Sequence, residues 1–397
     1  MEFFLIMRKV SAVVSTYNSE KFIYGRLINL TEQTLYKKND LEIIVIDSNS
    51  KENEKDIVEK FKIKYPDIIL IRTEKRETYY QALNRGIKIT ESKYFINANT
   101  DDRFRHDALE ILADNLDRAP GISAVYPDWF YTNIENDIFE SKTKKAVAYY
   151  PEFYPPFFLY FQVTSHASMI RKSVFNQIGD FNEEMKVFGD REFMLRLSSE
   201  GFKAKRVPMV LGLYYRNPRS LEHQGNTSKE FEQIREKYIE PKNLMRLFNF
   251  TEKYSNQELA KTYEKAANLG KDYNYLASHA LCDYVFINKL LKKSMTLNRH
   301  NSIALINLAV TEAYIGEKEK AKTSLREALL SANSLSCKIL ITFNLFLLKL
   351  SCSKKCFLIW KGHDHLILNI KYYILECLSL FRQRFDSNAN FREWGVR

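Results

Sequence analysis

Cysteine is scarce in this chain, with five in 397 residues, and all five lie in the last third of the sequence. The number is odd, and no pair recurs with the spacing of a zinc site. A disulfide framework and a zinc finger are therefore excluded as the basis of the fold. Such cysteine usage is typical of a reducing compartment, so we expect a cytoplasmic protein.

Long hydrophobic runs are also missing. The most apolar window, residues 339–350, contains Asn344 and Lys349. It is shorter than the roughly 20 residues that a membrane-spanning helix needs, so it predicts a buried helix. The apolar stretch at residues 3–7 is too short for the hydrophobic region of a signal peptide.

The sequence has no arginine-rich arm, no aromatic RNA-binding signature and no finger spacing, so we predict no nucleic-acid partner. Its net charge of +11 favours anionic partners, among them nucleotide diphosphates and acidic membrane surfaces. With 45% hydrophobic and 27% charged residues, the composition is that of a globular protein. The length leaves room for one large and one smaller domain.

The first half of the chain alternates strand-like and helix-like segments. Such an order predicts an α/β fold, with a parallel sheet, right-handed crossovers and helices on both faces. Strands are expected at 10–15, 41–46, 68–72 and 94–96, and helices at 20–35, 52–62 and 78–90. Further strands are expected at 124–126, 167–170 and 207–214, and helices at 107–117, 172–178 and 190–200.

Polar clusters follow three of the expected strands. They are Thr16-Tyr17-Asn18, Asp47-Ser48-Asn49 and Asn99-Thr100-Asp101-Asp102. Because ligands of such sheets bind beyond the carboxyl ends of the strands, we expect the clusters to converge. The third cluster offers hard oxygen ligands that suit Mg²⁺ or Mn²⁺ holding a diphosphate. The alternative is that its acids cap the helix expected from Asp107.

From about residue 231 onward the pattern is helical. We expect a domain at 1–220 and an all-α region at 221–397. Small residues between Asn307 and Ala328 resemble one tetratricopeptide repeat, and such repeats are expected near 259–334. A generic helical bundle is the alternative.

Five motifs in this order resemble the family 2 glycosyltransferases, over roughly the first 220 residues. They are Val10-Ser-Ala-Val-Val-Ser-Thr-Tyr-Asn18, Ile43-Ile-Val-Ile-Asp-Ser-Asn-Ser50, Tyr79-Tyr-Gln-Ala-Leu-Asn-Arg-Gly-Ile87, Asn99-Thr-Asp-Asp102 and Phe188-Gly-Asp-Arg-Glu-Phe-Met-Leu-Arg-Leu197. The resemblance implies the GT-A fold, a Rossmann-like mixed sheet with helices on both faces. It also implies an inverting sugar transferase that uses a nucleotide-diphosphate sugar and a divalent metal.

The resemblance implies a role for each matching residue. Asp190 would be the catalytic base, and Asp102, Asp101 and Asn99 would hold Mg²⁺ or Mn²⁺. The residues that would bind the nucleotide sugar are Thr16, Tyr17, Asn18, Asp47, Asn84, Arg85 and Asp101. Two positions depart from the family pattern: Asn99 stands where the family has an acid, and Gly189 replaces the acid that precedes the base.

The sequence thus predicts transfer of a sugar from a UDP- or GDP-type donor to a hydroxyl of a glycan, a lipid-linked sugar or a protein. A weakened transferase that serves as a binding or assembly protein, with its helical tail contacting a protein partner, is the first alternative. A nucleotidyltransferase is the second, although residues 15–22 lack the glycine-rich loop it needs. In the tail, residues 378–385 are a candidate for peripheral contact with an acidic membrane face, against a solvated helix face as the alternative.

Overall fold

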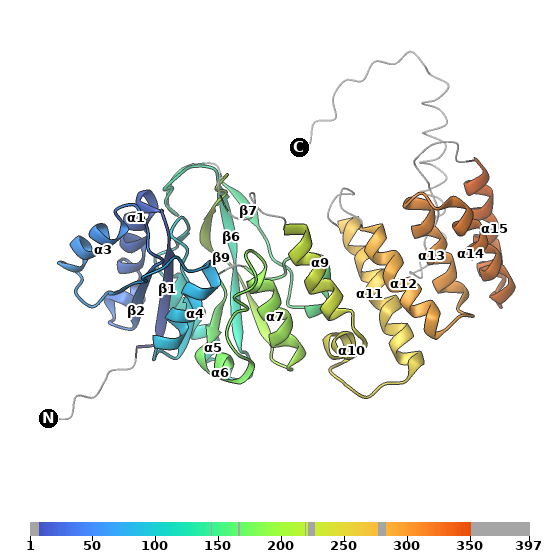
Figure 1. The fold of residues 1–397 in the computed structure, drawn as a ribbon, viewed down its shortest axis with the longest axis horizontal. Helices are drawn as coiled ribbons and strands as arrows, with labels where there is room; N and C mark the ends of the chain where they lie inside the picture. Colours follow the sequence, from blue (N-terminus) through green and yellow to red (C-terminus); the bar gives the residue numbers. More distant parts are fainter. Residues whose placement is uncertain are drawn as a thin grey trace, which may run out of the picture. The chain divides into compact units, whose positions relative to one another are not determined.

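The computed structural model describes residues 8–143, 145–165, 167–218, 220, 227–276 and 283–350. The chain divides into two compact units, Met1–Tyr254 and Ser255–Arg397. Each unit is described by itself. Figure 1 shows the elements of both units along the chain.

The first unit is built on one mixed sheet (Figure 1). Its path runs β3-β2-β1-β4-β8-β6-β9-β5, with β7 paired to β6. Strands β3, β2, β1 and β4 are parallel, whereas β8 is antiparallel to both β4 and β6. The strands are β1 Val10–Thr16, β2 Leu41–Asp47, β3 Ile69–Arg72, β4 Tyr94–Asn97, β5 Arg103–Phe104, β6 Ala124–Thr132, β7 Ala146–Ala148, β8 Met169–Arg171 and β9 Ala204–Tyr215.

Helices cover both faces of this sheet. On β1, Val10, Ala12 and Val14 join the core cluster that also contains residues of α1 (Glu20–Thr31), α3 (Glu54–Lys62) and α5 (Ala108–Asp117). Successive strand residues point to opposite faces, and Val13 meets α4 (Tyr79–Ile89) on the other side. A Cβ on Gly86 of α4 would lie 2.4 Å from Val13 Cγ1, so only glycine allows α4 to approach β1 this closely. The α/β fold predicted from the sequence is confirmed.

Some local expectations were wrong. The helix expected at 20–35 ends at Thr31, and a second short helix, α2, spans Thr34–Lys37. Gln33 breaks the run because its backbone is extended and its buried amide donates to the carbonyl oxygens of Asn29 and Arg105. The short strands β5 and β7 were missed, since two or three residues carry no readable alternation.

The remaining helices of the first unit are η1 Pro155–Leu159, α6 Lys172–Ile178, α7 Gly189–Ser199, α9 Thr227–Tyr238 and α10 Pro241–Asn249. The sequence assigns 221–254 to the helical region, but α9 and α10 lie in the same compact unit as the sheet. Arg235 of α9 explains part of this association, because its Nε donates to the carbonyl oxygen of Leu159 in η1.

The second unit is helical throughout its described part. Its helices are α11 Asn256–Leu276, α12 Tyr284–Leu297, α13 Ser302–Tyr314, α14 Lys318–Ser331 and α15 Leu335–Leu350. Ala309, Ala321 and Ala328 are fully buried between α13 and α14, so small side chains do lie where these helices approach. Assignment to tetratricopeptide repeats stays a prediction.

Within the described residues, no helix is both long enough and apolar enough to cross a membrane. The candidate membrane-contacting segment, 378–385, lies outside the described residues.

Candidate active site

The carboxyl ends of β1, β2 and β3 bring Thr16, Asp47 and Arg72 into register as direct neighbours. Asp47 is fully buried, and its carboxylate accepts hydrogen bonds from the Ser50 backbone N–H (2.8 Å) and from Arg72 Nη1 (2.7 Å). Both oxygens are thus engaged by the protein. Arg72, whose side chain is one-third exposed, is the group of this pair that can meet a ligand.

The turn after β1 is fixed by polar contacts to the turn after β2. Asn18 has a left-handed backbone (φ 48°), which asparagine adopts more readily than most residues. Its Oδ1 accepts from the Lys51 N–H, and its own N–H donates to Ser50 Oγ. The Arg76 guanidinium lies 4.1 Å from the centre of the Tyr17 ring. These contacts bring the first two predicted polar clusters together.

The acid cluster follows β4 directly. Asp102 is buried, and its carboxylate accepts from the Tyr215 N–H (3.2 Å) and from Asn99 Nδ2 (3.1 Å). Asp101 is half-buried, and its carboxylate accepts from Asn217 Nδ2 (3.2 Å). The difference in burial favours Asp101 over Asp102 as the acid that faces a ligand.

Asn99 is oriented by a tyrosine that the sequence did not single out. Its Oδ1 accepts from Tyr79 Oη (2.7 Å) and from Asn97 Nδ2 (3.1 Å), while its Nδ2 donates to Asp102. The Asn99 amide therefore connects Asp102 to Tyr79 of α4, and the amide oxygen already accepts two hydrogen bonds from the protein. The prediction that Asn99 holds a metal is untested, and this orientation does not favour it.

Two buried arginines lie close to the acids. Arg26 Nε donates to the carbonyl oxygen of Asn99 (2.6 Å), and Arg103 Nη1 donates to those of Thr100 and Asp102. Burial lowers the pKa of Arg26, and the neighbouring Arg103 lowers it further, whereas Asp102 and Asp101 raise it. The acids thus lie beside compensating positive charge, which makes their burial tolerable.

Asp190 lies in the first turn of α7. Its carboxylate accepts from the Arg191 N–H (2.7 Å) and from Gln162 Nε2 (3.2 Å). The pKa of Tyr79 is raised well above its usual value, chiefly by burial and then by the charges of Asp190, Asp102 and Asp101. The charges of all three carboxylates thus raise the pKa of one tyrosine hydroxyl, although Asp190 lies nearly 90 residues after the other two acids in the sequence.

Tyr80, the neighbour of Tyr79, fixes the start of α7. Its hydroxyl donates to the Val187 carbonyl oxygen (2.7 Å) and accepts from the Asp190 N–H (3.1 Å). A Cβ on Gly189 would lie 2.6 Å from the Tyr80 ring. The departure at Gly189 therefore has a steric cause: the ring occupies the space that any side chain would need.

We expect Gly189→Ala to destabilise the fold by about 1–3 kcal/mol, because the added methyl overlaps the Tyr80 ring and must displace it or α7. Urea unfolding measures this change. Gly121→Ala is the matched control, since a Cβ there meets nothing within 4 Å. Equal stability of Gly189→Ala and wild type would contradict the proposed packing.

Glu230 of α9 holds the segment that precedes α7. Its carboxylate accepts from three consecutive backbone N–H groups, those of Lys186 (2.7 Å), Val187 (3.0 Å) and Phe188 (3.2 Å). A residue beyond the predicted domain boundary thus helps to fix the position of Asp190.

We expect Glu230→Ala to speed amide hydrogen exchange at residues 186–188, because three N–H groups lose their common acceptor. The loss of these charge-assisted bonds should lower stability by about 1–3 kcal/mol. Lys229→Ala, an exposed change on the same helix, is the control. Unchanged exchange at 186–188 would show that the carboxylate does not hold this segment.

The hydrogen bonds of Asn84 and the ion pair of Arg85 are with residues outside the acid cluster. The Asn84 amide is buried and bonds both the carbonyl oxygen and the N–H of Phe181, and it also donates to Glu183 Oε1. The Arg85 guanidinium pairs with Glu77. We therefore interpret Asn84 as a structural residue of the segment before α7. The predicted role of both residues beside the ribose and diphosphate stays untested.

The acids of this site provide part of the oxygen donor set that a divalent metal needs. Within the described residues, no three His, Cys, Asp or Glu side chains gather closely enough to form a metal site by themselves. Mg²⁺ is often held by one or two carboxylates together with substrate phosphates and water. Asp101 and Asp102 fit this second arrangement, in which the nucleotide completes the site.

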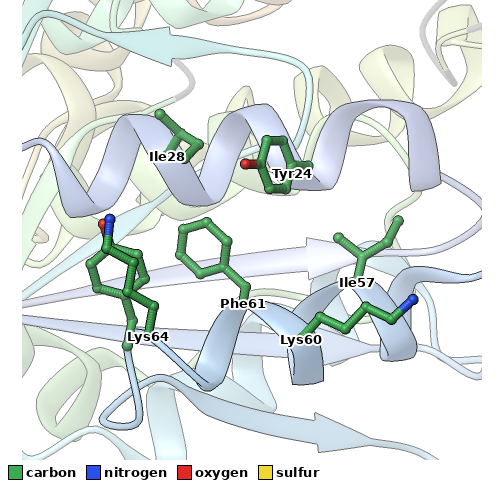
Figure 2. Close-up of a pocket in the computed structure, with 7 residues that line it drawn as sticks. Tyr24, Ile28, Ile57, Lys60, Phe61 and Lys64 are labelled. Atoms are coloured by element: carbon green, nitrogen blue, oxygen red, sulfur yellow. The ribbon is translucent and has the colours of Figure 1, made fainter.

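A cavity of about 350 Å³ lies between α1 and α3, away from the acids (Figure 2). Its walls carry apolar and aromatic side chains and two lysines, but no acid. The lining residues are Tyr24, Ile28, Ile57, Lys60, Phe61, Lys64 and Tyr65. Without a carboxylate, this groove lacks the chemistry for metal-assisted transfer.

The mixed sheet, with acids beyond the carboxyl ends of its parallel strands, has the arrangement of the GT-A fold. Residues 11–179 match the model of glycosyl transferase family 2. Residues 11–179 are therefore a family 2 glycosyltransferase domain, and the predicted family is confirmed for this part of the chain.

Individual relatives cover parts of the chain. The chain is 26% identical over 215 residues to the uncharacterized glycosyltransferase YwdF of Bacillus subtilis, covering 52% of this chain and 74% of that protein. It is 35% identical over 102 residues to a poly(ribitol-phosphate) β-glucosyltransferase of Bacillus spizizenii, covering 25% of this chain but 16% of that protein.

Among solved structures, S. aureus TarS 1–349 is similar, with a TM-score of 0.51, 18% identity, and coverage of 81% of this chain and 90% of that chain. The same fragment has been solved in complex with UDP, and it matches with a TM-score of 0.50 and 17% identity. At this identity the likeness establishes the fold alone.

Proposed function

We propose that this protein is an inverting glycosyltransferase that moves a sugar from a nucleotide-diphosphate sugar to an acceptor hydroxyl with the help of Mg²⁺ or Mn²⁺. The observation that carries the proposal is that the two tyrosines at the start of α4 connect the acids: Tyr79 bonds to Asn99, which donates to Asp102, and the Tyr80 hydroxyl accepts from the Asp190 N–H. The ends of β1 and β2, with Thr16 and Asp47, lie on the same edge of the sheet as the end of β4.

Each acid would have a separate task. Asp101, with Asp102 behind it, would hold the metal, and when bound the metal supplies Lewis-acid stabilisation to the leaving diphosphate. Asp190 would accept the proton of the acceptor hydroxyl as that oxygen attacks the anomeric carbon. Because one base assists one direct displacement, the configuration at that carbon would invert.

Arg72 is the group that we propose for contact with the nucleoside. Asp47 anchors its guanidinium, and Nη2 also donates to the carbonyl oxygen of Ser50 (2.7 Å), so its position is fixed before a ligand arrives. A uridine donor is favoured because TarS, which shares the fold, has been solved with UDP. Asp47 would then act through Arg72 rather than by touching the base.

For the acceptor we favour a hydroxyl on a polyol-phosphate chain. The names of two relatives, the poly(ribitol-phosphate) β-glucosyltransferase and TarS, a poly(ribitol-phosphate) β-N-acetylglucosaminyltransferase, point to such a polymer. The net charge of +11 suits a phosphate-bearing acceptor. Because these matches span 16% and 19% of the two relatives, the acceptor is proposed from the shared domain alone.

A panel of nucleotide sugars tests the proposal. UDP-glucose, UDP-N-acetylglucosamine, UDP-galactose and GDP-mannose are each incubated with Mn²⁺, with and without poly(ribitol phosphate), and release of the free nucleotide is measured. We expect one uridine donor to be consumed, faster with the polymer and not with EDTA. Consumption of no donor, while UDP still binds, would favour the alternative of a binding protein.

A further inference from the structure

A small cavity beside Asp190 is lined by polar side chains that the proposed reaction does not use. Its volume is about 20 Å³, which is enough for one water molecule. Asn97 reaches it from β4, and Thr164, Ser165 and Ser168 reach it from the segment before β8. The other lining residues are Asp190 and the apolar Phe95, Ile170, Phe181, Phe193 and Met194.

Three of the residues that line this cavity each carry a polar atom with no hydrogen-bond partner within the described residues. These atoms are Asn97 Oδ1, Thr164 Oγ1 and Ser165 Oγ, and all three residues are at least nine-tenths buried. Buried polar atoms are nearly always hydrogen-bonded, because an unmet bond costs about 1–3 kcal/mol each. Three such atoms around one cavity point to a common partner.

We propose that this cavity is a binding site for one ordered water molecule that connects Asp190 to the acid cluster. The water accepts from the hydroxyls of Thr164 and Ser165, and it donates to Asn97 Oδ1 and to the Asp190 carboxylate. Two to four polar partners in a cavity of this size are what a buried water requires. Asp190 lines the same cavity, and because a carboxylate offers about four acceptor positions, it can accept from the water as well as from Gln162 and Arg191.

The connection continues through Asn97 to the metal-binding side. Asn97 Nδ2 donates to Tyr79 Oη (2.5 Å) and to Asn99 Oδ1 (3.1 Å), and Asn99 donates in turn to Asp102. The water therefore closes a hydrogen-bonded chain between the base and the acids after β4. The role of this water is to position the Asp190 carboxylate. That role rests on the proposed function, whereas the binding of the water does not.

The test compares wild type with a Thr164→Val/Ser165→Ala double variant, which removes both donor hydroxyls with little change in volume. Ser168→Ala is the matched control, because Ser168 lines the same cavity but its hydroxyl already donates to the Ser165 carbonyl oxygen (2.9 Å). Crystal structures of the three proteins should show the water in wild type and in Ser168→Ala, and not in the double variant.

For the reaction, we expect kcat of the double variant to fall about tenfold with KM for the donor unchanged, as for the loss of other outer-shell partners. Ser168→Ala should keep the wild-type kcat. A wild-type cavity without water density, or an equal loss of kcat in Ser168→Ala and the double variant, would overturn the proposal. If no donor is used at all, the proposed function fails, while the crystallographic comparison still decides on the water.

Discussion

Asp190→Asn is expected to lower kcat about 10³-fold while the affinity for the nucleotide stays the same, because an amide cannot take the proton of the acceptor. The substitution preserves shape, and an amide oxygen can still accept from the Arg191 N–H, as the carboxylate does (2.7 Å). Initial rates with the donor identified by the panel, together with titration of UDP by calorimetry, measure the two quantities separately.

The matched control is Glu184→Gln, which removes an exposed carboxylate shortly before α7 and should leave kcat unchanged. If Asp190→Asn retains most of its activity, another group must deprotonate the acceptor. If instead it loses nucleotide affinity in proportion to kcat, the substitution has disturbed the fold of the site, and the assignment as base is not supported.

Asp101→Ala is expected to weaken metal-dependent nucleotide binding about 100-fold, since removal of one charged ligand costs about 3 kcal/mol. The half-buried Asp101 is the acid that faces a ligand, whereas Asp102 is 1% exposed and bonds to the Tyr215 N–H. Binding of UDP is measured by calorimetry in Mn²⁺ and in EDTA.

In EDTA, wild type and Asp101→Ala should bind UDP equally weakly, which separates the loss of metal from damage to the nucleotide pocket. Asp56→Ala, an exposed acid on α3, is the control for the change in net charge. Equal affinity of Asp101→Ala and wild type in Mn²⁺ would exclude Asp101 as the main ligand and would return that role to Asp102.

The sequence predicted the strands that carry the site. Buried parallel strands read as near-continuous apolar runs, so β1 and β2 were recognised to within one residue of their observed ends. The polar residues at those ends were then located by the rule that ligands bind at the carboxyl edge of the sheet. Thr16 and Asp47 are indeed direct neighbours there.

Most side-chain contacts between distant segments could not be predicted from the sequence. Arg72 could have been found, since it ends a predicted strand that lies next to Asp47. Glu230 could not, because nothing in its own helix indicates that its partners are the N–H groups of residues 186–188. The burial of Asp102 relative to Asp101 likewise depends on the approach of β9, which the sequence does not encode locally.

Each departure from the family pattern fits its surroundings in the structure. Asn99, whose oxygen accepts from Tyr79, donates its amide to Asp102, which an acid could not do, and the ring of Tyr80 fills the space beside Gly189. Both tyrosines begin α4, whose start is fixed by a capping box between Thr78 and Gln81. These substitutions are therefore matched to their surroundings, and they give no reason to assume that activity has been lost.

The most direct test of the central claim is anomalous diffraction from crystals of the protein that contain UDP and Mn²⁺. We predict a manganese peak in direct coordination with Asp101 and the diphosphate, with the uracil beside Arg72 and with Asp190 facing the open side of the diphosphate. A nucleotide bound elsewhere, or a manganese peak away from both Asp101 and Asp102, would contradict the account.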